Sequence, residues 1–304
     1  MTWKTPLSTV CFLLFSLSAM AEPKFVDEPV TGKVMTLQIL DVGQGDAIYI
    51  ESPDGKRMLI DAGPQGAKNQ IVEFLASKSI TRLDAIMVTH GHADHVGKML
   101  KVLNAVEVGQ VISSGFFHPT GMNEDILAAM KNKSIPMKVV VAGDSFKLGE
   151  YLDFKVIYPE KDAGLPAISV NDTSLVVKLT YGDVSFMLTG DAEHFTEELV
   201  VKYRPKDLDA DFLKAGHHGS ETASGNPFLD AVTPKVALIS CGENNKFSHP
   251  HKSTLDRFSE RGIKVLRTDR DGTLTITTDG KKVRIETEKK VPVSALFFVV
   301  GKAA

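Results

Sequence analysis

Cysteine is almost missing from this chain of 304 residues, which contains only Cys11 and Cys241. Cys11 lies in a segment that we expect to be removed, so no disulfide can form within the mature chain. A framework of disulfide bonds is therefore excluded as the source of stability. We expect a buried core to take that role, with Cys241 as a buried thiol just past an apolar run.

An excess of positive charge is also lacking, because 35 Lys and Arg residues are offset by 38 Asp and Glu residues. This balance gives no general argument for nucleic-acid binding, although a local basic patch is compatible with it. The sequence has no low-complexity linker and no repeat of the solenoid type. Its hydrophobic content of 43% and charged content of 24% are those of an ordinary globular protein.

Long apolar runs are rare, and the one near the N-terminus, Val10 to Leu17, is short for a membrane span. Lys4 precedes this run, and Ala19-Met20-Ala21 follows it as an A-x-A cleavage pattern. This order is typical of a secretory signal peptide, with a membrane anchor as the alternative. We predict a signal peptide over residues 1–21, a single mature domain over residues 22–304 and a periplasmic or secreted location.

The most informative stretch is Thr89-His90-Gly91-His92-Ala93-Asp94-His95, which follows an apolar run typical of a buried strand. Imidazole and carboxylate groups are the ligands that zinc and similar metals prefer. In extended backbone His90 and His92 point to the same side, whereas Asp94 and His95 belong to the next turn and can serve a second metal. A loop that is histidine-rich by chance is disfavoured, because H-x-H-x-D-H is far more specific than a single histidine.

Further segments place a carboxylate or an imidazole directly after a strand-like run. They are Asp61 after Arg57 to Ile60, Asp191 after Val184 to Leu188, His217 and His218 after Ala210 to Ala215, and His249 after Val236 to Ser240. Asp61 either holds a metal-binding histidine in place or caps a turn, and the sequence favours neither. We expect a structural role for Asp46.

These motifs resemble the signature of the metallo-β-lactamase superfamily. The segments D-V-G-Q-G-D-A from Asp41, N-x-x-S-L-V from Asn171 and L-K-x-G-H-H-G-S from Leu213 are similar to its ComEC-like branch, which is related to the extracytoplasmic hydrolase domain of competence DNA-uptake channels. The resemblance covers about residues 34–275.

Alternation of strand-like and helix-like segments by itself indicates α/β layers. The predicted helices cover residues 69–78, 96–104, 124–133, 193–203 and 254–260, and a C-terminal β-hairpin and tail begin at about residue 263. The resemblance implies a more definite fold, an αββα sandwich of two mixed β-sheets flanked by helices. It also implies that the metal site lies at one edge of the sandwich.

The resemblance further implies two divalent metal ions, zinc in the first place with manganese as the alternative. His90 and His92 would hold the first ion, Asp94, His95 and His217 the second, and Asp191 would bridge the two. His218 would then contact substrate or donate a proton to the leaving group, and the reverse assignment of His217 and His218 is the alternative.

A histidine that many superfamily members carry near residue 171 is missing here. Asn171, Asp172 or a water molecule would complete the first metal site, with Ser174 and His249 beside the substrate.

The implied reaction is hydrolysis by a hydroxide that two metal ions share and that Asp94 orients. The ComEC-like branch implies a phosphodiester substrate, either nucleic acid or a small molecule. One alternative is hydrolysis of a lactam, lactone or thioester on the same metals. An alternative of another class is a binding protein that keeps the fold without the activity.

Overall fold

Alternating burial in the strands builds the fold. In β2 (Met35–Ile39) the side chains of Met35, Leu37 and Ile39 are buried and the residues between them are half-buried. Since successive side chains of a strand point to opposite faces, each strand offers one apolar face for packing. The computed structural model describes residues 22–66, 70–161 and 169–289. The expected signal peptide lies outside these residues, as does a second short apolar run in the sequence, Ser294 to Gly301.

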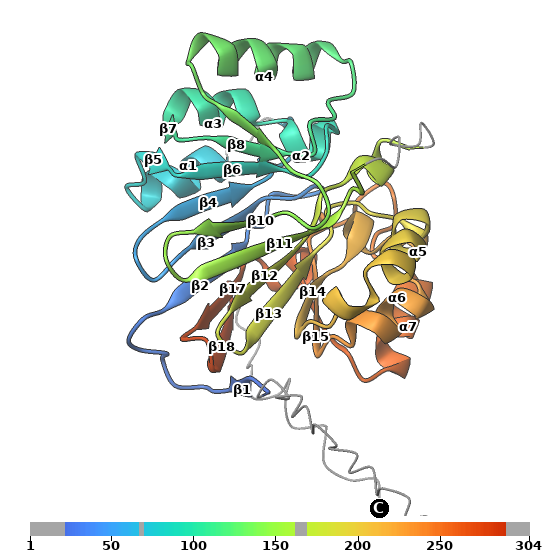
Figure 1. Ribbon diagram of the computed structural model, residues 1–304. Helices are drawn as coiled ribbons and strands as arrows, with labels where there is room; N and C mark the ends of the chain where they lie inside the picture. The colour runs from blue at the N-terminus through green and yellow to red at the C-terminus, as the bar shows by residue number, and fades with distance from the viewer. Residues whose placement is uncertain (1–21, 67–69, 162–168, 290–304) are drawn as a thin grey trace, which may run out of the picture.

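Two mixed sheets result, and they lie face to face (Figure 1). The nine-stranded sheet has the order β1 (Lys24–Phe25), β18 (Lys282–Thr287), β17 (Leu274–Thr278), β2, β3 (Ile48–Glu51), β4 (Arg57–Ile60), β6 (Ala85–Val88), β8 (Val111–Ser113) and β9 (Met137–Val139). The seven-stranded sheet has the order β10 (Ser145–Leu148), β11 (Leu152–Tyr158), β12 (Val176–Tyr181), β13 (Val184–Leu188), β14 (Phe212–Lys214), β15 (Val236–Ile239) and β16 (Lys264–Arg267). A small sheet pairs β5 (Arg82–Leu83) with β7 (Glu107–Val108).

Helices cover the outer face of each sheet (Figure 1). The nine-stranded sheet carries α1 (Gln70–Ser77), α3 (Met99–Ala105) and α4 (Gly121–Asn132), and the seven-stranded sheet carries α5 (His194–Tyr203), α6 (Asn226–Val232) and α7 (Lys252–Glu260). One buried cluster lies between the sheets and draws residues from both, such as Ile50 and Phe186. Two others join each sheet to its helices. The expected αββα sandwich is therefore confirmed.

Parallel pairing decides where the functional side chains gather. Strands β4, β6, β8 and β9 run parallel, as do β13, β14, β15 and β16. The carboxyl ends of parallel strands meet at one edge of a sheet, which is where open α/β sheets bind their ligands. Asp61, Asp191 and His249 follow three of these strand ends, and the short helices α2 (Ala93–Val96) and η3 (Gly216–Gly219) follow two more.

Some local expectations differ from the structure. The C-terminal hairpin β17–β18 is built into the nine-stranded sheet, because β17 pairs with β2. The sequence also predicts two strands around a turn at residues 269–272, and this turn is wrong. The helical turn α8 (Thr268–Asp271) lies there, and it connects β16 of the seven-stranded sheet to β17 of the nine-stranded sheet. Its Asp271 carboxylate accepts a hydrogen bond from the backbone N–H of Arg267. Helix α6 was not expected, since seven residues are too few for a clear helical period. No helix among the described residues is long and apolar enough to cross a membrane.

Candidate metal centre

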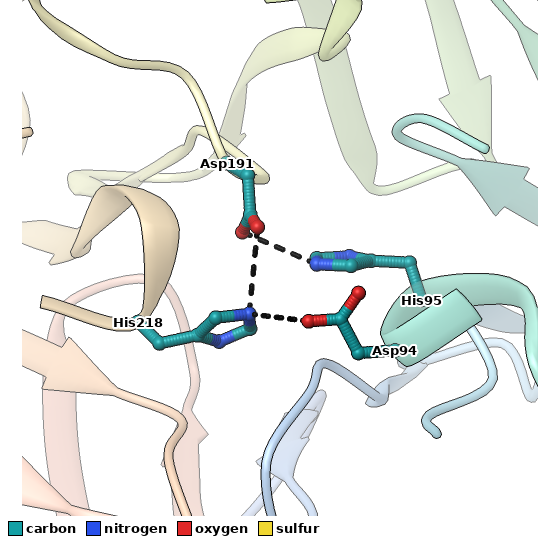
Figure 2. Close-up of side chains that lie close together, drawn as sticks. All are labelled: Asp94, His95, Asp191 and His218. Atoms are coloured by element: carbon teal, nitrogen blue, oxygen red, sulfur yellow. Dashed lines mark ion pairs between the residues drawn. The ribbon is translucent and has the colours of Figure 1, made fainter. Parts of the chain in front are cut away.

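The centre of the site is the carboxylate of Asp191, which lies in the loop after β13 and is buried. Its Oδ1 lies 3.2 Å from Nε2 of His95, and its Oδ2 lies 3.4 Å from Nε2 of His218 (Figure 2). His90 approaches the same Oδ2 with its Nε2 at 3.9 Å. One carboxylate therefore faces imidazoles from both sheets. The backbone N–H of Asp191 donates a hydrogen bond to the buried hydroxyl of Ser174 at 3.1 Å.

The loop after β6 supplies the remaining groups of the expected motif. The Nε2 of His90 and the Nδ1 of His92 are 3.1 Å apart, so these two rings converge as expected. Asp94 lies on α2, and its Oδ2 is 3.4 Å from Nε2 of His218 (Figure 2). Asp94, His95, Asp191 and His218 form one group that could hold a metal ion, and Asp46, Asp61 and His95 form a second.

Asp61 fixes the orientation of His95. Its Oδ2 lies 2.7 Å from Nδ1 of His95 and also accepts a hydrogen bond from the hydroxyl of Thr89 at 2.6 Å. Its Oδ1 accepts one from the backbone N–H of Thr89 at 2.9 Å. All three residues are buried, so the Nε2 of His95 is the ring atom turned toward Asp191. Of the two interpretations of Asp61, this geometry favours the one in which it holds a histidine.

Of the two histidines in the G-H-H-G segment, the one that reaches the centre is not the one that we expected. His218, not His217, reaches Asp94, His95 and Asp191. Both residues have left-handed backbone, with φ of 45° and 56°, so the turn sends their side chains in different directions. His217 is partly exposed, and its Nδ1 lies 2.8 Å from Oε1 of Glu193.

The other expected residues surround this centre. Asn171 places its Nδ2 3.4 Å from Nδ1 of His217 and also contacts His92. Asp172 lies apart from these rings and accepts a hydrogen bond from the hydroxyl of Thr196 on α5 at 3.2 Å. The ring of His249 is 5.3 Å from that of His217. Asn171 therefore lies beside the centre, and Asp172 is turned toward a helix.

A buried ion pair lies behind His218. Lys214, the last residue of β14, places its ammonium 2.9 Å from Oδ2 of Asp46 and donates a hydrogen bond to the carbonyl of Ala215 at 2.8 Å. The Oδ1 of Asp46 is 3.4 Å from Nδ1 of His218, which also lies 2.9 Å from the carbonyl oxygen of Ser240. With Nδ1 held in this way, the Nε2 of His218 faces the centre.

The sequence analysis assigned no role to Lys214 or Glu193, although the apolar strand around Lys214 does indicate one. A lysine inside an apolar strand is almost never fully buried unless it is paired, and this predicts a buried acidic partner. Asp46, expected to be structural, is that partner. Glu193 left no such signal, because its contact with His217 depends on the left-handed turn.

The imidazoles and carboxylates of the site shift one another's pKa values. Burial lowers the pKa of His95 and of His218, but Asp191 and neighbouring carboxylates outweigh it and raise both pKa values well above the usual range. Burial raises the pKa of Asp191, but His218 and His95 hold it well below its usual value. His90 is different, because burial and the nearby His95 lower its pKa. The buried carboxylates therefore stabilise positive charge around Asp191.

The donor set fits divalent metal ions. Among the described residues, Nε2 of His95, Oδ1 of Asp191 and Nε2 of His218 are buried and make no hydrogen bond of good geometry. Buried polar atoms normally form hydrogen bonds, so three such atoms that face one point without a hydrogen bond fit a bound metal ion. Imidazole nitrogen and carboxylate oxygen suit zinc, and they also suit manganese or iron.

Comparison with known proteins gives a family and several relatives. The model described as "Metallo-beta-lactamase superfamily" matches residues 40–243. ComE operon protein 3 of Bacillus subtilis (strain 168) is 34% identical over 283 residues, which make up 88% of this chain and 34% of that protein. Competence protein ComA of Neisseria gonorrhoeae is 28% identical over 248 residues, 81% of this chain and 33% of that protein. The chain thus spans about a third of the length of these curated relatives.

A solved structure supports the fold alone. The metallo-beta-lactamase fold protein YhfI from Bacillus subtilis matches with a TM-score of 0.53 and 13% sequence identity. The match covers 81% of this chain and 100% of that one.

The buried ion pair behind His218 generates a stability prediction. We expect Lys214→Met to lower the free energy of unfolding by about 3–5 kcal/mol, because it leaves the Asp46 carboxylate buried without its cation. Urea unfolding of the metal-free protein would measure this. Lys155→Met is the matched control, since Lys155 pairs with Asp207 at 2.6 Å but is 44% exposed, and such pairs contribute about 0–1 kcal/mol. Equal losses in the two variants would contradict the prediction.

Proposed function

This chain belongs to the metallo-β-lactamase superfamily of metal-dependent hydrolases, and from that premise we propose that it is an exported phosphodiesterase that uses two divalent metal ions. The observation that carries the proposal is the position of the Asp191 carboxylate, which has imidazoles on both of its oxygens. A carboxylate between two cations offsets their mutual repulsion.

The side chains divide into two sets around Asp191. His90 and His92 would hold the first ion, with the amide of Asn171 beside them. Asp94, His95 and His218 would hold the second. Bound divalent cations would polarise the scissile group and make a water molecule acidic enough to attack at neutral pH. We propose zinc as the native metal, with manganese as the alternative.

His217 takes the role of the residue that assists the leaving group. Its Nδ1 faces Glu193, whose Oε1 also accepts a hydrogen bond from the hydroxyl of Thr222 at 2.6 Å. The glutamate thereby orients the ring and leaves Nε2 as the atom that can reach substrate. Its partial exposure suits a group that meets a ligand from solution.

A site that holds two divalent cations suits a scissile group that carries negative charge. The cations would offset the charge on a phosphodiester and the further charge that develops in the transition state. A lactam, lactone or thioester would be polarised by the same metals and is the alternative that a comparison of substrates decides.

The similarity to competence proteins agrees with a phosphodiester substrate, because the ComEC-like branch implies one. A binding protein without activity is the rival of another class. It is disfavoured because Nε2 of His95, Oδ1 of Asp191 and Nε2 of His218 are buried and face one point without a hydrogen bond. A fold that is kept without its metal site does not need this arrangement.

We expect Asp191→Ala to abolish turnover, because it removes the group shared by both ions. Initial rates on a chromogenic phosphodiester, a lactam and a thioester would identify the substrate class, and elemental analysis would give the metal content. Asp153→Ala, which changes a 60% exposed carboxylate on β11, should keep full activity. Unchanged turnover in the Asp191 variant would refute the proposed mechanism.

The exchanged histidines give a second prediction. His218→Ala should bind about one metal ion fewer per chain than wild type, because His218 would be a ligand. His217→Ala should keep its metal content while kcat falls about 100-fold, the usual scale for losing a group that assists proton transfer. Elemental analysis together with kinetics separates the two roles. Loss of metal in His217→Ala with full retention in His218→Ala would reverse the assignment.

Export is proposed from the sequence pattern of residues 1–21. We expect the protein isolated from the extracytoplasmic fraction to have the mass of a chain that starts at Glu22. Intact-mass measurement would check this. A chain that stays in the cytoplasm with its first residues intact would rule the proposal out.

A further inference from the structure

An exposed aromatic ring lies two positions before His249 in the sequence. Phe247 exposes 47% of its surface, although large apolar side chains are usually buried. Its ring is stacked on that of His249, with centroids 5.6 Å apart and an angle of 25° between the planes. The ring of His249 lies 6.3 Å from that of His218. A row of rings thus leads from the surface to the candidate metal centre.

The loop that presents Phe247 is held together by Asn245. Its side-chain oxygen accepts hydrogen bonds from the backbone N–H groups of Phe247 at 3.1 Å and His249 at 3.0 Å. Its side-chain nitrogen donates to the carbonyl groups of Gly242 at 2.9 Å and His249 at 2.6 Å. One side chain therefore holds both ends of the loop, and these hydrogen bonds fix the backbone that presents Phe247 at the surface.

A cation accompanies the exposed ring. The ammonium of Lys246 lies 4.9 Å from the centroid of the Phe247 ring, and the lysine is itself exposed. Such a contact is weak at an exposed site, about 0.5–1 kcal/mol, so another planar group can displace it. The displaced ammonium would remain close enough to meet an anion.

We propose that Phe247 and Lys246 form a subsite that stacks a nucleobase of the substrate. This inference rests on the proposed phosphodiesterase function and narrows the substrate class to phosphodiesters that carry a nucleobase. Aromatic side chains bind single-stranded nucleic acid by stacking on the flat faces of the bases, which requires no particular sequence. The base would lie on Phe247, its phosphate would face Lys246, and the adjoining phosphodiester would reach the metal centre past His249.

Steady-state kinetics on two substrates would test this subsite. One substrate is a thymidine dinucleotide, and the other is glycerophosphocholine, a phosphodiester that has no planar group. For Phe247→Leu, which keeps an apolar side chain without the ring, we expect KM for the dinucleotide to rise about tenfold, in line with base–aromatic stacking. KM for glycerophosphocholine should not change, and Phe247→Tyr should behave as wild type on both substrates.

Tyr203→Leu is the matched control. Tyr203 is 55% exposed at the end of α5, and the ammonium of Lys202 lies 4.9 Å from its ring centroid. It therefore repeats the exposed ring and its cation on a helix that ends away from the centre, and its removal should leave both KM values unchanged.

The outcomes separate this inference from the proposed function. If Phe247→Leu leaves KM for the dinucleotide unchanged, or raises both KM values equally, the subsite is overturned while the phosphodiesterase stands. If wild type cleaves neither substrate, the proposed phosphodiesterase function is refuted. A binding measurement then tests the subsite by itself. Fluorescence anisotropy with a phosphorothioate-linked hexathymidylate, which resists cleavage, should then show about tenfold weaker binding by Phe247→Leu. Equal binding by both proteins would overturn the subsite.

Discussion

The site depends on a single buried carboxylate, that of Asp191. Taking a carboxylate out of water is costly, and the cost is offset only when cations or hydrogen-bond donors surround it. Here His95 and His218 approach its two oxygens from different sheets, at 3.2 Å and 3.4 Å. Both histidines are fixed from behind, one by Asp61 and the other by the carbonyl of Ser240. The loops at this edge of the sandwich are therefore arranged around one negative charge.

Close packing of two loops makes this arrangement possible. Gly45 has a φ of +144°, and a Cβ at this position would lie 2.2 Å from the carbonyl oxygen of Asp94. The next residue, Asp46, donates a backbone hydrogen bond to the same carbonyl. Glycine is thus required where the D-V-G-Q-G-D-A segment meets α2. The contact joins the loop before β3, which carries Asp46, to the helical turn that carries Asp94 and His95. The ion pair with Lys214 and the candidate metal centre therefore form one unit.

The sequence predicted the layers and named most residues of the centre. Strand periodicity and polar residues at strand ends are local patterns, and they identified His90, His92, His95 and Asp191 as candidates. That these residues share one site was implied by the family resemblance. The roles of His217 and His218 could not be read in the same way. The two histidines are adjacent and share the same neighbouring sequence, so only the backbone angles of the turn determine which ring faces the centre. Non-local pairs such as Lys214 with Asp46 also need the fold before they can be seen.

The left-handed turn at His217 and His218 has a cost that helps to explain its place. Non-glycine residues in this backbone region carry strain, on the order of 1–3 kcal/mol each, and they persist only where the surroundings fix them. His218 is fixed by Ser240 and by the acidic centre, and His217 is fixed by Glu193. This turn leaves His218 buried at the centre and His217 partly exposed beside Glu193. The strain thus lies at the point where the proposed metal ligand and the proposed substrate contact diverge.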